Sequence, residues 1–345
     1  MKKIILRILY ILQFHRIARL LNRNKVIILM YHAFTEKTQF DGIANYHHQN
    51  LNIDIFRKQI DYLKKNYRII SLPEFIESVH SKGKTPQNSV IITIDDGYRS
   101  NYLLAFPVLK ESQTPATIFI TTSFVDNKLP LWADRIEYAI NITSKPKLEL
   151  EYEKLSFDLT SKEMKIACDK AIKSILKLDV QEQRDKIVEN IEAILNAKLS
   201  INDATDEIYQ PLSWNEINEM LQSGFVSIGS HTHSHFILSK CSPQTAENEL
   251  RLSKKIIEDK TANKCDLFCY PNGKQNDFNN ETERLVKRTG YKCALTTISG
   301  MNSIDSNPYE LKRIGIGDEE DMMEFIMKIS GVMHSLQKIK KIFSR

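Results

Sequence analysis

Two groups of residues in this chain have the types and the spacing for metal-assisted chemistry. The first is a pair of adjacent carboxylates, Asp95 and Asp96, which directly follow the apolar, β-branched run at residues 90–94. Two neighbouring aspartates at the end of a buried strand are costly unless a positive charge lies beside them, and a metal cation is the obvious candidate. The second group, His231 and His235, comes far downstream and also follows an apolar run.

The spacing of the two histidines suits a shared metal ion. Residues four apart face the same side of a helix or helical turn, so both imidazoles could bind one ion. With one aspartate they form a two-histidine, one-carboxylate set, which leaves coordination positions for water and substrate and is therefore catalytic in type. The second aspartate suits a general base that takes a proton from water, and the charge of the metal would keep both carboxylates ionised. Either motif alone is weak, but together they predict metal-assisted hydrolysis.

Strands and helices alternate along most of the chain, and this alternation must position the two groups. We expect strands near residues 25–32, 67–71, 90–94, 116–121, 225–229, 267–270, 292–296 and 311–316. Helices are expected over residues 55–66, 72–79, 100–113, 243–259 and 279–289, after the N-cap Ser213, and from Asp318 onward. This order predicts an α/β fold with a parallel sheet and right-handed crossovers, either a barrel or a doubly wound sheet.

The alternation stops between Trp132 and Trp214. Residues 148–159 alternate apolar and polar side chains, which predicts a hairpin or a pair of edge strands. Residues 162–199 have helical periodicity, which predicts two helices broken near Leu178. We therefore expect a small α+β insertion at about residues 140–210, which serves as a packing or lid element and carries no catalytic cluster.

Composition and charge narrow the class of protein. The chain has 345 residues, with 42% hydrophobic and 26% charged residues, as in an ordinary globular protein with a substantial core. The net charge of +5 gathers toward both ends of the chain, which favours contact with a membrane surface over a nucleic-acid partner. Five scattered cysteines are an odd number, so we expect reduced, mostly buried thiols, as suits a cytoplasmic or inner-leaflet location.

The first 24 residues form a basic and apolar segment for which three interpretations stay open. Arg7 interrupts the apolar run, which is shorter than the roughly 20 residues that span a bilayer. The helical spacing suits either a helix at the membrane surface or a helix packed on the domain. Export through a secretory signal is the third interpretation, although no cleavage site of small residues follows Phe14. The main domain is expected over residues 25–331, followed by a basic tail at 332–345.

The motifs resemble those of a known enzyme family. Residues 93–97, Thr-Ile-Asp-Asp-Gly, are similar to the T-F-D-D-G motif of the polysaccharide deacetylases, which share the NodB-type domain. Residues 231–235 match that family's H-[S/T]-x-x-H motif, and residues 268–273 resemble the third motif, which forms one wall of the groove. The resemblance runs from about residue 26 to residue 331 and implies a distorted (β/α)7-type barrel with the helical insertion.

The resemblance also implies a role for each matched residue. Asp95 would be the catalytic base, and the backbone N–H of Tyr270, next to Pro271, would help to hold the oxyanion. One divalent metal ion, usually zinc, with Co2+, Ni2+ or Fe2+ as other occupants, would be bound by Asp96, His231 and His235. The other nearby histidines have no such role: His233 is expected to point away from the metal, and His47 and His48 are expected to be solvated loop residues.

The chain departs from the common family pattern at two points. The usual acid is a histidine near the C-terminus, but the only candidate there, His334, follows no strand. The first strand instead ends in Tyr31-His32, which resembles the permuted subgroup that includes the poly-N-acetylglucosamine deacetylases. We therefore assign His32 as the general acid, with a histidine merely hydrogen-bonded at a strand end as the alternative. The arginine that normally orients the base is missing, and Arg313 either supplies that charge or forms a simple surface ion pair.

We expect a metal-dependent hydrolase that removes N-acetyl groups from N-acetylhexosamine residues of a bacterial glycan or glycan precursor. An O-deacetylase, a non-sugar amidohydrolase and a catalytically silent carbohydrate-binding relative stay open as alternatives. A non-haem iron oxygenase also uses two histidines and a carboxylate, but it needs no base such as Asp95. The expected partner is an N-acetylated glycan, with no nucleic acid, and the oligomeric state is left open. The expected location is cytoplasmic or peripheral at the inner membrane, with export to the cell envelope as the alternative.

Overall fold

Seven parallel strands form a closed ring at the centre of the molecule. The computed structural model describes residues 2–150, 154–178, 180–201, 207–318, 321–334 and 336. The ring closes because the strand Ile27–Tyr31 pairs in parallel with both Ser89–Ile94 and Leu311–Gly315. The predicted (β/α)7-type barrel is therefore confirmed. Around the ring the order is β1 (Ile27–Tyr31), β5 (Ser89–Ile94), β6 (Ala116–Ile120), β9 (Val226–Ser230), β10 (Leu267–Cys269), β11 (Cys293–Ser299) and β12 (Leu311–Gly315).

The strands of the ring are buried on both sides. All six residues of β5 are buried, which explains why this strand is a continuous apolar run instead of an alternating one. Its β-branched side chains pack well on a pleated surface between the filled interior and the outer helices. A short strand, β4 (Arg68–Ile69), adds to β5 beside the ring, and β2 (Ala33–Thr35) pairs with β3 (Asn50–Asn52) after β1.

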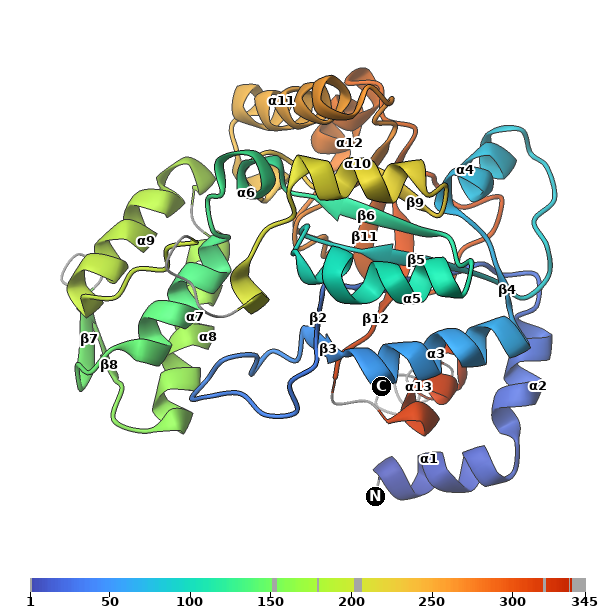
Figure 1. Cartoon of the computed structure of the whole chain (residues 1–345), viewed down its shortest axis with the longest axis horizontal. Helices are drawn as coiled ribbons and strands as arrows, with labels where there is room; N and C mark the ends of the chain where they lie inside the picture. Colours follow the sequence, from blue (N-terminus) through green and yellow to red (C-terminus); the bar gives the residue numbers. More distant parts are fainter. Residues whose placement is uncertain are drawn as a thin grey trace.

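Helices cover the outside of the ring (Figure 1). Several begin at the capping residues seen in the sequence: Ser213 and Glu216 form a capping box, and Asn279 accepts from two backbone N–H groups. The helix expected over residues 100–113 begins instead as a π-helix (Asn101–Ala105), because Pro107 has no N–H to bond within the preceding turn. The covering helices are α3 (Ile53–Asn66), α4 (Leu72–His80), α5 (Phe106–Glu111), α10 (Trp214–Gln222), α11 (Pro243–Thr261), α12 (Asn280–Arg288) and α13 (Met322–Ile329), with a short α6 (Thr122–Asn127) after β6.

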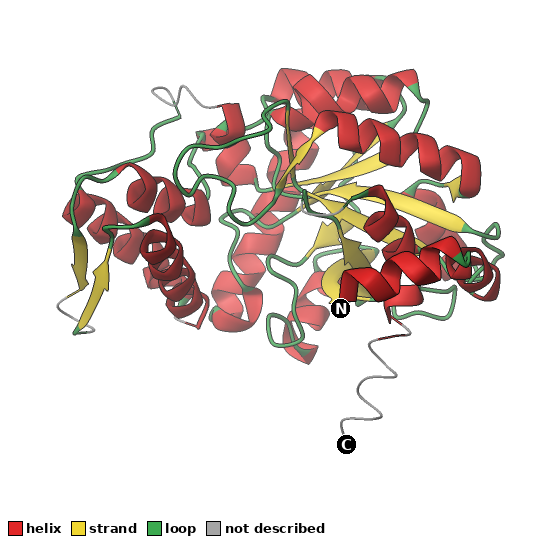
Figure 2. Ribbon diagram, turned by 90° about the horizontal axis from the view of Figure 1, so that it is seen from below, coloured by secondary structure: helices red, strands yellow, loops and turns green. Residues whose placement is uncertain are grey.

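A second lobe lies at one side of the barrel in both ribbon views (Figures 1 and 2). It has its own apolar core, to which each of its elements contributes. The predicted hairpin and the two predicted helices are present, but the lobe begins at Trp132, ahead of the expected boundary, because Trp132 and Ile136 pack in its core. Its elements are α7 (Trp132–Ile142), β7 (Lys147–Leu150), β8 (Leu155–Asp158), α8 (Lys162–Leu178) and α9 (Gln181–Leu195).

The N-terminal segment folds as two short helices, α1 (Lys2–Ile11) and α2 (Phe14–Leu21), which meet at Gln13. One face of α1 packs on the domain, where Leu6 is buried with Met327 and Val332. None of the helices in the described ranges is long and apolar enough to cross a membrane. Most of the predicted basic tail, residues 337–345, lies outside the described residues.

Candidate active site

The candidate site residues come together at the carboxyl ends of the barrel strands. Asp95 and Asp96 follow β5, His231 follows β9 and His32 follows β1. In a parallel barrel the carboxyl ends of all strands lie at the same end of the ring, where loops can build a site. The topology therefore joins residues that are separated by up to 199 positions in the sequence, as His32 and His231 are.

Asp96, His231 and His235 form one compact group of donor atoms. One oxygen of Asp96 lies 3.5 Å from Nε2 of His231 and 3.4 Å from Nε2 of His235, and all three donor atoms lie within 4.8 Å of one another. Nδ1 of His231 lies 2.8 Å from the carbonyl oxygen of Cys269. Because a carbonyl only accepts, Nδ1 carries the proton and the lone pair of Nε2 faces Asp96. Two imidazoles and one carboxylate are a donor set that suits a divalent ion such as zinc.

The electrostatics of this group agree with a metal site. Burial lowers the pKa of His231 to about 4, so this imidazole is neutral near pH 7, as a metal ligand must be. Burial acts to raise the pKa of Asp96, but the hydrogen bond and charge of His235, followed by the charges of His32 and His231, hold that pKa below its ordinary value. Asp96 is therefore ionised and available as a ligand.

The loop that carries the two histidines is not helical, contrary to the expected helical turn. Thr232 and His235 have φ angles of +66° and +54°, so the chain bends twice within this motif. Side chains from elsewhere hold the bend: Glu249 of α11 accepts from the N–H groups of His233 and Ser234 at 2.9 and 2.7 Å. These bonds satisfy backbone groups that a helix would satisfy by itself.

The lobe also holds this loop. Arg184 of α9 donates to the carbonyl oxygens of Ser234 and His235 at 2.9 and 3.0 Å. Its guanidinium is buried between the rings of Trp132 and Phe236, at 5.0 and 4.8 Å from their centroids. Burial lowers the pKa of Arg184 to about 10, so the group stays charged at neutral pH. The lobe thus contributes directly to the placement of His235, a role that its sequence did not indicate.

The expected base, Asp95, is held by Arg313 inside the barrel. The two terminal nitrogens of Arg313 donate to the two carboxylate oxygens of Asp95 at 2.8 and 2.7 Å, and both residues are buried. Burial acts to raise the pKa of Asp95, but the charge and hydrogen bonds of Arg313 hold that pKa below its ordinary value. Of the two alternatives for Arg313, the surface ion pair is excluded by this burial, and the structure supports the orienting contact.

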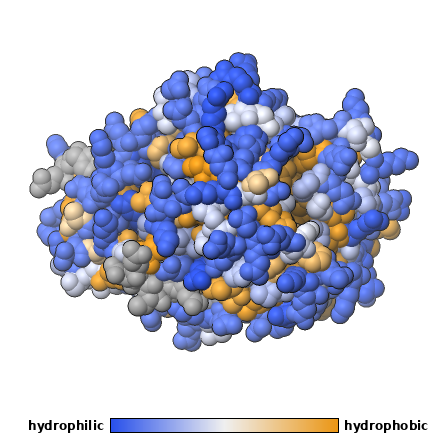
Figure 3. Space-filling model, turned by 45° about the horizontal axis from the view of Figure 1, so that its top comes forward, coloured by the Kyte–Doolittle hydropathy of each residue, from blue (hydrophilic) through white to orange (hydrophobic). Residues whose placement is uncertain are grey.

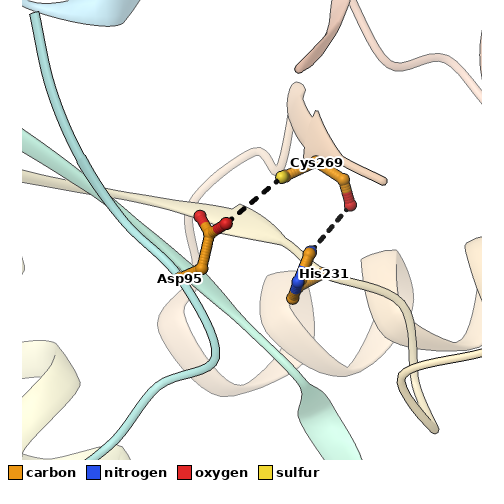
Figure 4. Close-up of side chains that lie close together, drawn as sticks. All are labelled: Asp95, His231 and Cys269. Atoms are coloured by element: carbon orange, nitrogen blue, oxygen red, sulfur yellow. Dashed lines mark hydrogen bonds between the residues drawn. The ribbon is translucent and has the colours of Figure 1, made fainter. Parts of the chain in front are cut away.

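Cys269 is a neighbour that the sequence did not single out. Its Sγ lies 3.7 Å from Asp95 and 3.0 Å from Nη2 of Arg313, while its carbonyl accepts from His231 (Figure 4). All five cysteines are free and four are buried, as predicted. Asp95, His231 and Cys269 could be read as a second donor set. This second set fits a metal less well, because burial raises the pKa of the Cys269 thiol and because Arg313 already donates hydrogen bonds to both carboxylate oxygens of Asp95.

His32 lies half-buried at the end of β1 and is close to both aspartates. Its charge contributes, after larger effects, to the lowered pKa of Asp95 and of Asp96. The side chain of Asn101, in the π-helix, donates to the carbonyl oxygen of His32 at 2.8 Å and fixes the backbone there. π-Helical turns often accompany functional sites, and this one brings a buried amide to a predicted site residue.

The oxyanion donor predicted at Tyr270 needs a correction. The N–H of Tyr270 donates to the carbonyl oxygen of Leu295 at 3.0 Å, as part of the ladder between β10 and β11, so it is already used. The next turn offers another polar group, since Nδ2 of Asn272 is buried without a partner among the described residues. The turn itself requires Gly273, because φ is +63° and a Cβ would lie 2.9 Å from the backbone nitrogen of Thr297.

The remaining histidines lie outside the donor group. Nδ1 of His233 is 2.9 Å from Oγ1 of Thr122, which turns this ring away as predicted. His47 and His48 are not simply solvated, because His47 contacts Asp169 of the lobe at 3.3 Å and His48 pairs with Asp318. These two contacts therefore tie the loop to the lobe and to the segment after β12 while both rings stay partly exposed, a long-range effect that local polarity could not reveal.

Comparison with known proteins now decides the family. The family model described as polysaccharide deacetylase matches residues 82–294, which is more than half of the chain. The chain belongs to the polysaccharide deacetylase family. Residues of the Asp-Asp motif, the histidine motif and β10 all fall within the matched segment.

Individual relatives are distant. YxkH of Bacillus subtilis (strain 168), provisionally named a polysaccharide deacetylase, is 23% identical over 299 residues, which cover 85% of this chain and 71% of the relative. A poly-beta-1,6-N-acetyl-D-glucosamine N-deacetylase of Staphylococcus epidermidis is 28% identical over 190 residues. The matched segment covers 52% of this chain and 63% of that enzyme, which is less than two thirds of its length. The structure of the Streptococcus pyogenes deacetylase PplD has a TM-score of 0.58 and 18% identity, covers 88% of this chain and 98% of its own, and supports the fold.

Proposed function

We propose that this member of the polysaccharide deacetylase family is a metal-dependent enzyme that removes N-acetyl groups from N-acetylhexosamine residues of a bacterial glycan. The observation that carries the proposal is the buried, bidentate Arg313–Asp95 pair beside the donor group of Asp96, His231 and His235. The name of the Staphylococcus epidermidis relative supports poly-N-acetylglucosamine as the first substrate to test.

Asp96, His231 and His235 would hold one divalent ion, with zinc favoured by two imidazoles and one carboxylate. When bound there, such an ion would polarise a carbonyl and acidify a water molecule. The chain prepares the ligands itself: the carbonyl of Cys269 sets the tautomer of His231, while Arg184 and Glu249 fix the loop of His235.

Asp95 would accept the proton of the attacking water. Its carboxylate is ionised because Arg313 lowers its pKa, and the two parallel hydrogen bonds fix its plane. A carboxylate oriented in this way is ready as a general base without reorganisation at the moment of reaction.

His32 would donate the proton that the leaving amine needs. It comes from β1, a neighbour of β5 in the ring, and its backbone is held by Asn101. Hydrolysis of an amide requires both a base for the water and an acid for the amine, and the Asp95–His32 pair supplies both from adjacent strands.

The proposal is tested by acetate release from N-acetylglucosamine oligomers by the full chain, after chelation and after zinc is restored. We expect release that depends on zinc. Asp95→Asn and His32→Gln should each lower kcat by about 100-fold or more while zinc remains bound. A folded protein that binds no divalent ion and releases no acetate from N-acetylated glycans would overturn the proposal. Release from O-acetylated glycans or non-sugar amides alone would move the substrate to that class.

A further inference from the structure

The N-terminal helices expose an unusual number of large apolar side chains. Among the described residues, sixteen large hydrophobic residues are exposed, and nine of them lie within residues 4–21. By contrast, the face over α10 and α11 is mostly hydrophilic, with hydrophobic residues visible only in patches between polar ones (Figure 3). The nine residues are Ile4, Ile5, Ile8, Ile11, Leu12, Phe14, Ile17, Leu20 and Leu21. We call them the N-terminal apolar surface.

The exposed residues of α1 follow helical spacing. Positions 4, 5, 8 and 11, with Leu12 directly after the helix, recur at intervals of three and four and therefore form one continuous stripe. The opposite side of the same helix is occupied, because Leu6, Leu9 and Tyr10 pack against the domain around Met327. The helix is thus apolar on two faces, and only one of these faces is covered by the rest of the chain.

The second helix repeats this arrangement. Phe14, Ile17 and Leu21 are exposed, while Arg19 ties the helix to the domain through a 2.7 Å hydrogen bond to Asn66 and lies over the ring of Tyr67. Both helices are therefore anchored at the edge of the molecule next to α13 and α3 (Figure 1). A fixed apolar surface of this kind marks an interaction site, because soluble proteins rarely leave large contiguous apolar patches in water.

The charges of the segment itself are of one sign, although Lys3 lies 3.6 Å from Glu324 of α13. Residues 1–25 contain seven lysines and arginines, and the first acidic residue of the chain is Glu36. Two copies of this surface facing each other would bring these positive charges together, which opposes a symmetric self-contact. An anionic partner with an apolar interior would instead complement both features.

We propose that α1 and α2 form a membrane-surface docking site for a bilayer that contains anionic lipid. Exposed apolar side chains with basic neighbours are the pattern of helices that lie in the bilayer interface, with the apolar stripe below the headgroups. The helices have 10 and 8 residues, much shorter than the roughly 20 that span a bilayer, so the proposed contact lies at the membrane surface. This site is separate from the proposed function and fails or stands independently of it.

The experiment is co-sedimentation of the full chain with vesicles of phosphatidylcholine alone or mixed with phosphatidylglycerol. We expect binding to the anionic vesicles and at least about tenfold weaker binding to the neutral ones. Ile8→Glu/Ile11→Glu, at positions 51% and 74% exposed, should reduce anionic binding by at least about tenfold. Ile8→Ser/Ile11→Ser should also reduce it, which separates lost apolar contact from added charge.

The matched control is Met164→Glu/Leu252→Glu, which places the same two charges at exposed apolar positions of α8 and α11. It should bind anionic vesicles as the unmodified chain does, and all variants should retain acetate release from soluble oligomers. Equal loss of vesicle binding in the control and in the Ile8 and Ile11 variants would overturn the proposal. So would a dimer in sedimentation velocity that Ile8→Ser/Ile11→Ser dissociates while vesicles bind neither form, because the surface would then be a contact between two copies.

Discussion

Arg313 and Asp95, which are 218 residues apart in the sequence, form two parallel hydrogen bonds inside the barrel. Each residue is at most 2% exposed, so solvent screens their interaction very little. The pair offsets the cost of burying the carboxylate and also fixes its orientation. The third motif lacks its usual arginine, and Arg313 of β12 contacts the carboxylate of Asp95 from another strand of the ring.

Changing Arg313 should affect both the fold and the pH profile. Arg313→Met leaves the charge of Asp95 buried without its partner, so we expect the free energy of unfolding to fall by about 3–5 kcal/mol. Arg313→Lys keeps a positive charge but cannot form both parallel hydrogen bonds, so it should be more stable than Arg313→Met. Because Arg313 lowers the pKa of Asp95, both changes should raise that pKa and move the acid limb of kcat/KM to higher pH, by about 1–3 units in the Met variant. An acid limb that stays in place would mean that Arg313 serves only the fold.

Substitution of either histidine ligand candidate should affect zinc affinity far more than substitution of the histidine between them. His231→Ala and His235→Ala should each weaken zinc binding by more than about 100-fold, since each removes a donor atom of the group. His233→Ala is the matched control, because its ring contacts Thr122 and lies outside the group. Zinc affinity is measured by competition with a chromophoric chelator. If His233→Ala lost zinc as severely as the other two, the assigned ligand set would be wrong.

Arg184 should act on the metal site from the lobe. Arg184→Met removes the hydrogen bonds to the carbonyls of Ser234 and His235, so we expect zinc affinity to fall by about 10–100-fold. The control is Arg135→Met, which breaks the buried pair of Arg135 with Glu192 within the lobe but leaves the histidine loop untouched. Chelator competition and urea unfolding are measured on both variants. Equal losses of zinc affinity would show that lobe stability, and not Arg184 itself, supports the site.

Asp134 should make stability depend on pH. Burial, with Glu137 nearby, raises the pKa of Asp134 from 3.8 to about 8. Between these pH values the folded state holds a proton that the unfolded state lacks. The contribution of Asp134 to the free energy of unfolding is therefore complete below pH 3.8 and is lost as the pH rises toward 8. The slope is about 1.4 kcal/mol per pH unit for one proton.

Asp134→Asn removes this titration. The free energy of unfolding of this variant, relative to that of the unmodified chain, should therefore increase as the pH rises toward 8. Urea unfolding at several pH values measures the difference. Asp61→Asn, on the exposed side of α3, serves as the control and should follow the unmodified chain in parallel. Parallel curves for Asp134→Asn as well would show that Asp134 titrates normally in the folded state.

Local patterns in the sequence were enough for the strands of the barrel, most helices and the metal-ligand candidates, but not for the short pair β2 and β3. The continuous apolar run of β5 predicts a strand buried on both faces, and the Ser213–Glu216 capping box predicts the start of α10. Both features can be recognised in the sequence because they depend on residues only a few positions apart. The two motifs with Asp95–Asp96 and His231–His235 each stand directly after a strand, so the parallel order of the barrel brought them to one end.

Tertiary structure decided the contacts that depend on how separate elements meet. The contact of Arg313 with Asp95 required the register of β12 against β1 and of β1 against β5, and the contacts of Arg184 required the docking of the lobe on the histidine loop. The helical turn expected at residues 231–235 and the free N–H expected at Tyr270 were wrong for the same reason. Glu249 and the β10–β11 ladder, both distant in sequence, determine those backbones. Sequence therefore indicated the candidate site residues, while the packing of distant elements decided how they are held.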